Sequence, residues 1–178
     1  MHTGNNHGVC WILQVGMYSK YCGWEEMFHF CQNRFMYKYL PEMAPDGSFP
    51  FETARSKSYG YSIFNLDAMV GVCQALSTPD CDLFAFEASN GNTIRMAMDF
   101  LFPYIKDKSN WPYGKDVTHW EDWPVAQPFM IFAWNRFCKD RNFPAEDYYQ
   151  TWLSLEHFPT DKEVIRNLPM RHPIIWIY

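Results

Sequence analysis

The sequence predicts an all-α fold of antiparallel helices joined by loops, and three observations carry this prediction. Apolar residues recur three and four positions apart along several segments, which is the spacing of one face of a helix. No segment shows the alternation of apolar and polar residues that marks a half-buried strand. Proline and glycine residues that form turns separate the periodic segments.

Helices are expected over seven segments, whose ends carry start and stop residues. Gly23 suits the left-handed C-cap of the first helix, and Pro41 stops the second. Pro103 marks the end of the fifth, and Pro144 suits the first turn of the last. The third has the clearest buried stripe. The seven segments are residues 8–22, 24–39, 58–76, 82–87, 93–105, 125–137 and 144–155.

Two stretches outside these helices have their own patterns. Residues 106–124 are polar, aromatic and irregular, which predicts a long loop of the kind that often has a function. Towards the end of the chain, a short helix is expected over 161–168 and an extended segment over 169–178.

The loop 106–124 is rich in aromatic residues. Its side chains either stack on sugar rings or bury the loop against the core, and the residues concerned are Trp111, Tyr113 and Trp120. A histidine and two acidic residues also lie there, but their spacing matches no metal-ligand motif, so no metal site is predicted. These three residues are His119, Glu121 and Asp122.

Length, composition and charge exclude several classes of protein. With 178 residues, of which 48% are hydrophobic, the chain can form one globular domain with a sizeable core. Its longest apolar runs, such as residues 129–134, are far shorter than the roughly 20 residues of a membrane-spanning helix. The net charge of -5 argues against nucleic acid as a partner, because phosphate binding needs a basic surface. An acidic ligand would therefore need a local basic cluster.

The six cysteines contain no C-x-x-C pair, which argues against zinc-knuckle and thioredoxin-like sites. Four of them lie within helical patterns, where thiols commonly pack as small apolar groups. Buried thiols are therefore favoured, with disulfides as the alternative. The cysteines are residues 10, 22, 31, 73, 81 and 138.

One short stretch, which ends in the third expected helix, contains a carboxylate, two cations and two phenols. Glu52, Arg55 and Lys57 are followed directly by Tyr59 and Tyr61. Arginine stays charged at any working pH, while a tyrosine beside cations can lose its proton more easily. The stretch can therefore clamp an acidic substrate and move a proton.

Alternatives are open within this stretch. Arg55 could pair with Glu52, three residues away, and this pairing is compatible with a substrate role. Tyr59 and Tyr61 point to different sides of a helix, so we expect that one packs while the other faces a cleft.

The motif Asn5-Asn-His-Gly8 precedes the first expected helix. An amide and an imidazole there lie at the positive end of the helix dipole, where an anion can bind. The alternative is a simple N-cap. Considered together with Arg55 and Tyr61, an anion site is favoured, because each element supplies what the others lack.

Together these motifs make the sequence resemble the alginate lyase superfamily of polysaccharide lyases, in particular its alginate and glucuronan lyase branches. The motifs span nearly the whole chain in the family's order. They are Asn5-Asn-His-Gly8 followed by Gln14, Glu52-x-x-Arg55-x-x-Ser-Tyr-Gly-Tyr-Ser-x-Phe-Asn-Leu66, Trp111-Pro-Tyr113, and Arg166-Asn-Leu-Pro-x-x-x-Pro-x-x-Trp176.

The resemblance implies a set of site residues. The family's catalytic asparagine and histidine fall on Asn6 and His7, and its arginine falls on Arg55. Its catalytic tyrosine falls most naturally on Tyr61, with Tyr59 as the second candidate, because the arginine-to-tyrosine spacing differs among relatives. Substrate contacts are expected from Glu52, Tyr59, Trp111 and Tyr113.

The resemblance also implies an α/α toroid, with residues 1–178 forming a single domain. Family members carry a helical half ahead of the asparagine-histidine motif, so the chain is expected to be the C-terminal half of a toroid, truncated at its N-terminus. A full-length protein is expected to be secreted or periplasmic.

The implied activity is cleavage of a 4-linked uronate polymer, alginate or glucuronan, by β-elimination without a metal or organic cofactor. Asn6, His7 and Arg55 would hold the uronate carboxylate. Tyr61 would act as base and acid on mannuronate or glucuronate, and on guluronate His7 would be the base with Tyr61 as acid.

Two other functions are compatible with the sequence. One is a remnant that binds uronate without cleaving it. The other is an α/α-toroid glycoside hydrolase, which needs two carboxylates beside the scissile bond, such as Glu52 with Asp116 or Glu121.

Overall fold

The computed structural model describes residues 5–157 and 173–177, and within them it confirms the predicted all-α fold. The extended pairings in these ranges are two isolated bridges, Thr78 with Cys81 and Val125 with Glu156. The α-helices are α1 (Asn6–Cys22), α2 (Glu25–Arg34), α3 (Pro50–Thr53), α4 (Ser58–Leu76), α5 (Ile94–Lys106), α6 (Pro128–Phe137) and α7 (Ala145–Ser154). The other elements are the π-helix η1 (Phe35–Tyr39) and the 3-10 helices η2 (Lys108–Asn110) and η3 (Pro173–Trp176). The toroidal arrangement stays a prediction.

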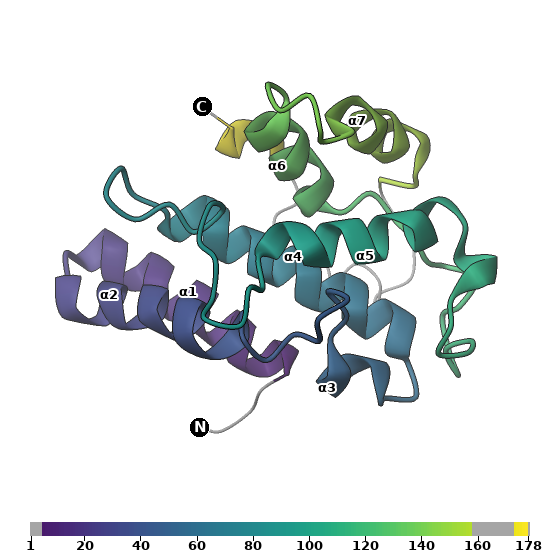
Figure 1. The fold of residues 1–178 in the computed structure, drawn as a ribbon, viewed down its shortest axis with the longest axis horizontal. Coiled ribbons are helices and arrows are strands. Elements are labelled where there is room, and N and C mark those ends of the chain that lie inside the picture. The colour runs from purple at the N-terminus through teal and green to yellow at the C-terminus, as the bar shows by residue number, and fades with distance from the viewer. Residues whose placement is uncertain (1–4, 158–172, 178) are drawn as a thin grey trace.

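Helix α4 is the centre of the fold. In Figure 1 it runs through the middle of the molecule, with α1 and α2 on one side and α5 to α7 on the other. It packs against α1, α3, α5 and α6. Nearly all of its residues are buried, so α4 is a core helix without a broad solvent face.

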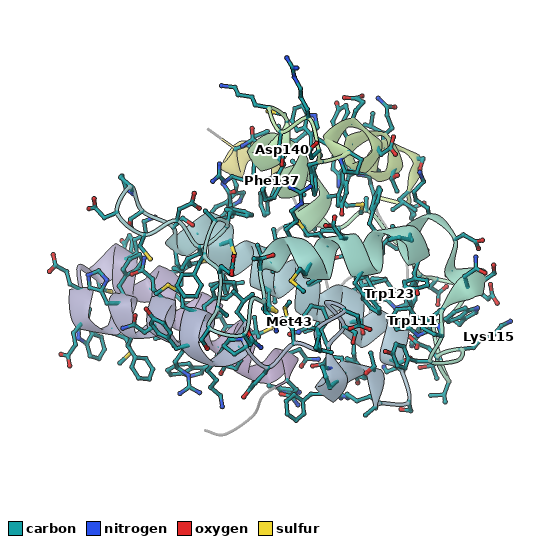
Figure 2. The ribbon with its side chains drawn as sticks, viewed as in Figure 1. Met43, Trp111, Lys115, Trp123, Phe137 and Asp140 are labelled. Atoms are coloured by element: carbon teal, nitrogen blue, oxygen red, sulfur yellow. The ribbon has the colours of Figure 1, made fainter. Side chains whose placement is uncertain are left out.

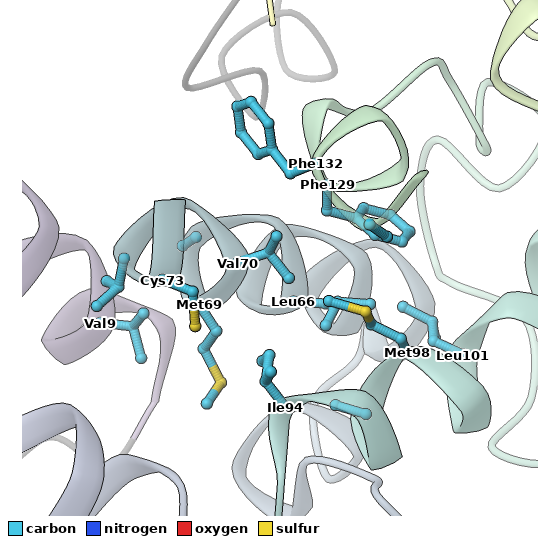
Figure 3. Packing of buried hydrophobic residues seen from close by; sticks show 14 of the residues in the cluster. Val9, Leu66, Met69, Val70, Cys73, Ile94, Met98, Leu101, Phe129 and Phe132 are labelled. Carbon is cyan, nitrogen blue, oxygen red and sulfur yellow. The ribbon is translucent and has the colours of Figure 1, made fainter. Parts of the chain in front are cut away.

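The core around α4 draws side chains from four helices, as Figure 3 shows. Each of its labelled residues is at most 1% exposed. The removal of this apolar surface from water is the main force that holds α1, α5 and α6 against α4. The labelled residues are Val9 of α1, Leu66, Met69, Val70 and Cys73 of α4, Ile94, Met98 and Leu101 of α5, and Phe129 and Phe132 of α6.

Both ends of α1 carry the capping residues that the sequence suggested. The Asn5 side chain is the N-cap and accepts the His7 backbone N–H at 3.2 Å. Gly23 closes the helix with a φ of 69°, which a glycine adopts without strain. Because α1 begins at Asn6, the asparagine-histidine motif forms its first turn rather than a segment ahead of it.

The helix expected over 24–39 is present but changes its winding before Pro41. Its last five residues form η1, in which the Leu40 N–H donates to the Phe35 carbonyl at 3.0 Å, five residues back.

Residues 83–85 form a turn and the rest of the segment 82–87 is irregular, so the prediction of a short helix there is wrong. The Asp82 carboxylate accepts the Phe84 N–H at 3.0 Å, and the Ser77 hydroxyl accepts the Leu83 N–H at 3.1 Å. Aspartate and serine commonly hold turns in this way, and the Ala88 N–H donates forward to the Asn92 carbonyl at 2.9 Å rather than back along a helix.

The start of the helix after the loop also differs from expectation. Helix α6 begins at Pro128 instead of residue 125, because the Ala126 N–H donates to the Glu156 carbonyl at 2.9 Å and holds this segment extended. Helix α5 matches its prediction of 93–105 to within one residue at each end, since a proline near the end of a helix removes only one backbone hydrogen bond.

The expectations for the end of the chain are tested only in part. Residues 173–176, expected to be extended, form the 3-10 helix η3. The expected helix over 161–168 and residues 169–172 lie outside the described residues.

A buried carboxylate joins α6 to α4. Asp67 of α4 is 1% exposed and accepts the Phe129 N–H, in the first turn of α6, at 2.8 Å. It serves as the cap for α6, since the N-cap residue Gln127 makes no side-chain cap bond. Burial raises the pKa of Asp67 to about 8, with the Phe129 N–H acting in the opposite direction.

Raising the pH is expected to destabilise the fold through Asp67. Its pKa of about 8 in the folded protein exceeds the unfolded value of about 3.9. Its contribution to stability is therefore complete below the unfolded pKa and is lost as the pH rises through the folded pKa, by at most about 1.4 kcal/mol per pH unit. Asp67→Asn keeps an acceptor for Phe129 and should flatten this dependence in urea unfolding at a series of pH values. The exposed Asp80→Asn is the control, and an unchanged pH profile in Asp67→Asn would contradict the prediction.

All six cysteines are free thiols, so the disulfide alternative is not realised. The buried-thiol prediction is right for Cys31 and Cys73, whereas Cys22 and Cys138 are exposed. None of the helices in residues 5–157 and 173–177 has the length and apolar character needed to cross a membrane.

Candidate active site

The two main motifs meet where three helices come together. Helices α1 and α4 pack side by side, and at one end of this pair their first turns lie beside α3 (Figure 1). This arrangement brings Asn6 into hydrogen-bond contact with Glu52, although 46 residues separate them in sequence.

Glu52 is the centre of this contact network and is 0% exposed. Its Oε1 accepts the Asn6 backbone N–H at 2.6 Å. Its Oε2 accepts Asn6 Nδ2 at 3.1 Å and Arg55 Nη1 at 3.3 Å. Both oxygens are therefore used inside the protein. The substrate contact expected from Glu52 is corrected accordingly, because Glu52 holds Asn6 and Arg55 instead.

The charge of Glu52 is coupled to the cationic groups around it. Burial raises the pKa of Glu52. The Asn6 N–H, the Arg55 guanidinium and, to a smaller extent, His7 act in the opposite direction by favouring the carboxylate. His7 is exposed, so it joins the network by charge rather than by contact with the core.

Arg55 and Tyr61 form a stacked pair. The guanidinium carbon lies 3.4 Å from the centroid of the Tyr61 ring, and Lys57 Nζ lies 5.3 Å from it. These are cation–π contacts. The Arg55 side chain is 31% exposed and Tyr61 is half-buried, so the pair presents a positive charge and a phenol on one surface.

The two tyrosines of the motif have different environments, as the sequence suggested. Tyr59 is 0% exposed, and its hydroxyl donates to the Tyr104 carbonyl at 2.8 Å. Burial, together with the charge of Asp116, raises its pKa well above the usual range. Tyr59 is thus a packing residue without surface for a ligand, which corrects the substrate contact expected from it and leaves Tyr61 as the tyrosine that faces outward.

The structural role of Asp116 was missed from the sequence. Helix α4 starts directly after Lys57, which offers no acceptor for the first backbone N–H groups. Asp116 supplies both acceptors from the loop, since its two carboxylate oxygens accept the N–H groups of Tyr59 and Gly60 at 2.8 Å each. The only signal in the sequence was a helix start without a capping residue.

Gly60 allows the loop to approach this turn closely. A Cβ atom at Gly60 would lie 2.9 Å from Trp123 Nε1 and 3.2 Å from Asp116 Oδ2. The loop and the first turn of α4 therefore fit each other only with glycine here, and together they position Tyr61.

Among the loop aromatics, Trp111 packs inside. It is 6% exposed, and its Nε1 donates to the Ser58 hydroxyl at 2.9 Å. Tyr113 is 43% exposed and remains available to a ligand. Figure 2 shows Trp111 and Trp123 within this end of the molecule and Lys115 at its outer edge. Trp111 therefore buries the loop, and because its small exposed part lines the cleft described next, the sugar contact expected from it stays a prediction.

The loop also forms an open cleft of about 540 Å³. The half-buried Trp120 lines it, with Lys108 Nζ at 5.2 Å and Lys115 Nζ at 5.9 Å from the Trp120 ring centroid. Lys108 Nζ also donates to the Trp120 and Trp123 carbonyls, which fixes this wall of the cleft. The exposed Lys115, beside the same aromatic face, suits an acidic sugar.

The three carboxylates suggested for a glycoside hydrolase, Glu52, Asp116 and Glu121, do not form the pair that such an enzyme requires. Glu52 and Asp116 are buried with both oxygens hydrogen-bonded. The Glu121 side chain is 83% exposed and pairs with Lys108 at 3.7 Å. In the part of the chain that the structure describes, no group of three histidine, cysteine, aspartate or glutamate residues could hold a metal ion.

Four of the expected site residues form one continuous chain of contacts. Asn6 and Arg55 both bind Glu52, and Arg55 stacks on Tyr61. His7 lies in the same helical turn as Asn6. The surface of this site therefore offers a guanidinium, a phenol and an imidazole above a buried carboxylate.

Comparisons with known proteins show which family the chain resembles. A family model described as alginate lyase matches residues 1–111, a range that contains all of these five residues. Among solved structures, the chain is similar to an alginate lyase from Bacteroides ovatus, with 28% sequence identity and a TM-score of 0.68. The similarity covers 93% of this chain and 42% of that one, so the chain spans less than half the length of this relative. No curated protein matches.

Proposed function

The chain belongs to the alginate lyase family, and from this premise we propose that it acts as a polysaccharide lyase on a 4-linked uronate polymer, alginate or glucuronan. One observation carries the proposal: the Arg55 guanidinium stacks on the Tyr61 ring and is anchored to the buried Glu52. This places a cation that can bind a carboxylate beside a group that can transfer a proton. β-Elimination next to a carboxylate needs both.

The first task is to hold the uronate carboxylate. During elimination the C5 proton leaves, its bonding electrons form the C4–C5 double bond, and the C4–O4 bond breaks. Negative charge develops at the carboxylate in this process, and a guanidinium stabilises it through paired hydrogen bonds. Among the described residues, Arg55 donates only Nη1 to a protein group, so its other N–H groups can face the substrate. His7 lies in the first turn of α1, where the positive end of the helix dipole also favours binding of a carboxylate.

The second task is proton transfer, which we assign to Tyr61. On mannuronate or glucuronate, where the C5 proton and O4 lie on one face, its phenolate takes the C5 proton and its hydroxyl returns a proton to O4. On guluronate the two lie on opposite faces, so His7 takes the proton and Tyr61 protonates O4. Arg55 and Lys57 contact the ring and offset the negative charge of the phenolate.

Asn6 takes part mainly through its position. It is 3% exposed, and both its backbone N–H and its Nδ2 donate to Glu52. We therefore assign Asn6 to fixing the first turn of α1, which presents His7, rather than to a wide contact with the substrate.

The test is an assay of the purified protein on polymannuronate, polyguluronate and glucuronan. A lyase produces an unsaturated uronate that absorbs ultraviolet light, whereas a hydrolase produces reducing ends without this absorbance. Rising absorbance with at least one polymer supports the proposal. New reducing ends without absorbance would indicate the hydrolase, and binding without any product would indicate a uronate-binding protein without activity.

Arg55→Lys is expected to lower kcat/KM on polyuronate by roughly 10-fold or more, because an ammonium cannot grip a carboxylate with two parallel hydrogen bonds. Arg95→Lys is a matched control, since Arg95 is also 31% exposed and ion-paired, to Asp140, away from the site. Initial rates over a range of polymer concentrations measure the effect. Unchanged kinetics in Arg55→Lys would mean that the arginine serves only Glu52.

A further inference from the structure

A small cavity lies behind Glu52. It offers about 10 Å³ to the centre of a water molecule, which is on the order of the space that one buried water needs. Most of its lining is apolar, and its polar lining residues include Glu42, Glu52 and Asn65. Two buried oxygens of these residues, Glu42 Oε2 and Asn65 Oδ1, have no hydrogen-bond partner in the described protein.

The neighbouring atoms explain why these two oxygens are left over. Asn65 is 4% exposed, and its Nδ2 donates to Met69 Sδ at 3.7 Å along α4, so its Oδ1 is the unused atom. Glu42 Oε1 pairs with Lys38 Nζ at 3.1 Å on the surface side, which leaves Oε2 inside. Burying an acceptor without a donor is costly, so each oxygen requires a partner.

The chemistry of the cavity selects the partner. Both unpaired atoms are acceptors and cannot bond to each other. Glu52 cannot supply a donor either, because its two oxygens already accept from Asn6 and Arg55. A water molecule has two O–H donors and fits the volume.

We propose that this cavity binds one structural water, which donates one hydrogen bond to Asn65 Oδ1 and the other to Glu42 Oε2. The bridge ties the segment that leads into α3 to helix α4, directly behind Glu52. Asn65 lies four residues after Tyr61, on the same face of α4. Because Glu52 lines the same cavity, we expect the water also to influence the position of Glu52 relative to Tyr61, a role that goes beyond the proposed reaction.

A double-mutant cycle tests the bridge by urea unfolding and needs no lyase activity, so it is independent of the proposed function. Asn65→Leu and Glu42→Leu each leave one acceptor unpaired, whereas the double variant removes both. We expect the double variant to lose less stability than the sum of the losses in the two single variants, so that it unfolds at a higher urea concentration than additivity predicts. Lys38→Met is the control, because it breaks the surface pair with Glu42 but keeps Oε2. Strict additivity would overturn the bridge.

A crystal structure and carbon NMR give direct readouts. The wild-type crystal should show one water at about 2.8 Å from both Asn65 Oδ1 and Glu42 Oε2. A turned Asn65 amide that bonds directly to Glu42 with no density between them would overturn the proposal, as would a metal ion at this position. The ¹³C chemical shift of the Glu52 side-chain carboxyl should change in Asn65→Leu. It should stay the same in the control Lys38→Met. An unchanged chemical shift in Asn65→Leu would show that the cavity does not influence Glu52.

Discussion

Replacing Tyr61 by phenylalanine is expected to lower the rate of β-elimination by on the order of 10²-fold or more while leaving polyuronate binding nearly unchanged. The substitution removes only the hydroxyl that transfers the proton. The ring that lies 3.4 Å from the Arg55 guanidinium carbon is kept, so the stacking and the ion pair of Arg55 with Glu52 survive. Initial rates from product absorbance and calorimetric binding of a uronate oligomer measure the two quantities separately.

Tyr59→Phe is the matched control for this prediction. It removes the same hydroxyl from a tyrosine that is buried and donates to the Tyr104 carbonyl. We expect a loss of stability, because that carbonyl loses its donor, with the rate of the folded protein largely retained. An inactive Tyr59→Phe beside an active Tyr61→Phe would reverse the assignment of the two tyrosines.

The helical framework could be predicted because its signals are local. Asn5 and Gly23 mark the ends of α1 by their own capping chemistry, and the third expected segment matches α4 at both ends. The failure at residues 82–87 is also local. Apolar residues suggest a helix there, but the Ala88 N–H donates forward to the Asn92 carbonyl, and apolar spacing alone does not reveal this pairing.

The site was predictable as a set of residues but not as a network. The motif residues Arg55 and Tyr61 do lie together, since a few positions separate them in sequence. The contacts of Asn6 with Glu52 and of Asp116 with Gly60 span 46 and 56 residues, and only the packing of the helices creates them. Sequence reasoning therefore gave Glu52 a role towards the substrate, whereas its complete burial turns it into an internal anchor.

This anchoring role makes Glu52→Gln the second substitution with a large expected effect. Glutamine offers one acceptor oxygen and one amide nitrogen in place of two acceptor oxygens. In one orientation the glutamine oxygen accepts the Asn6 backbone N–H, and its NH₂ faces Asn6 Nδ2 and Arg55 Nη1. In the opposite orientation the NH₂ faces the Asn6 backbone N–H. Donors face donors in either case. We expect the free energy of unfolding to fall by about 1–3 kcal/mol, as for other buried groups left unpaired.

The same substitution should also weaken the grip on the substrate, because Arg55 loses the charged partner that fixes its guanidinium. A small displacement of a binding group is enough to cost on the order of 10-fold or more in kcat/KM. We expect this loss mainly in KM, whereas the loss in Tyr61→Phe lies in kcat, so the two variants separate carboxylate binding from proton transfer. Glu26→Gln, on the exposed side of α2, is the control for removing a negative charge. A Glu52→Gln protein that is less stable but keeps the wild-type KM would show that the buried carboxylate supports the fold without orienting Arg55 for the substrate.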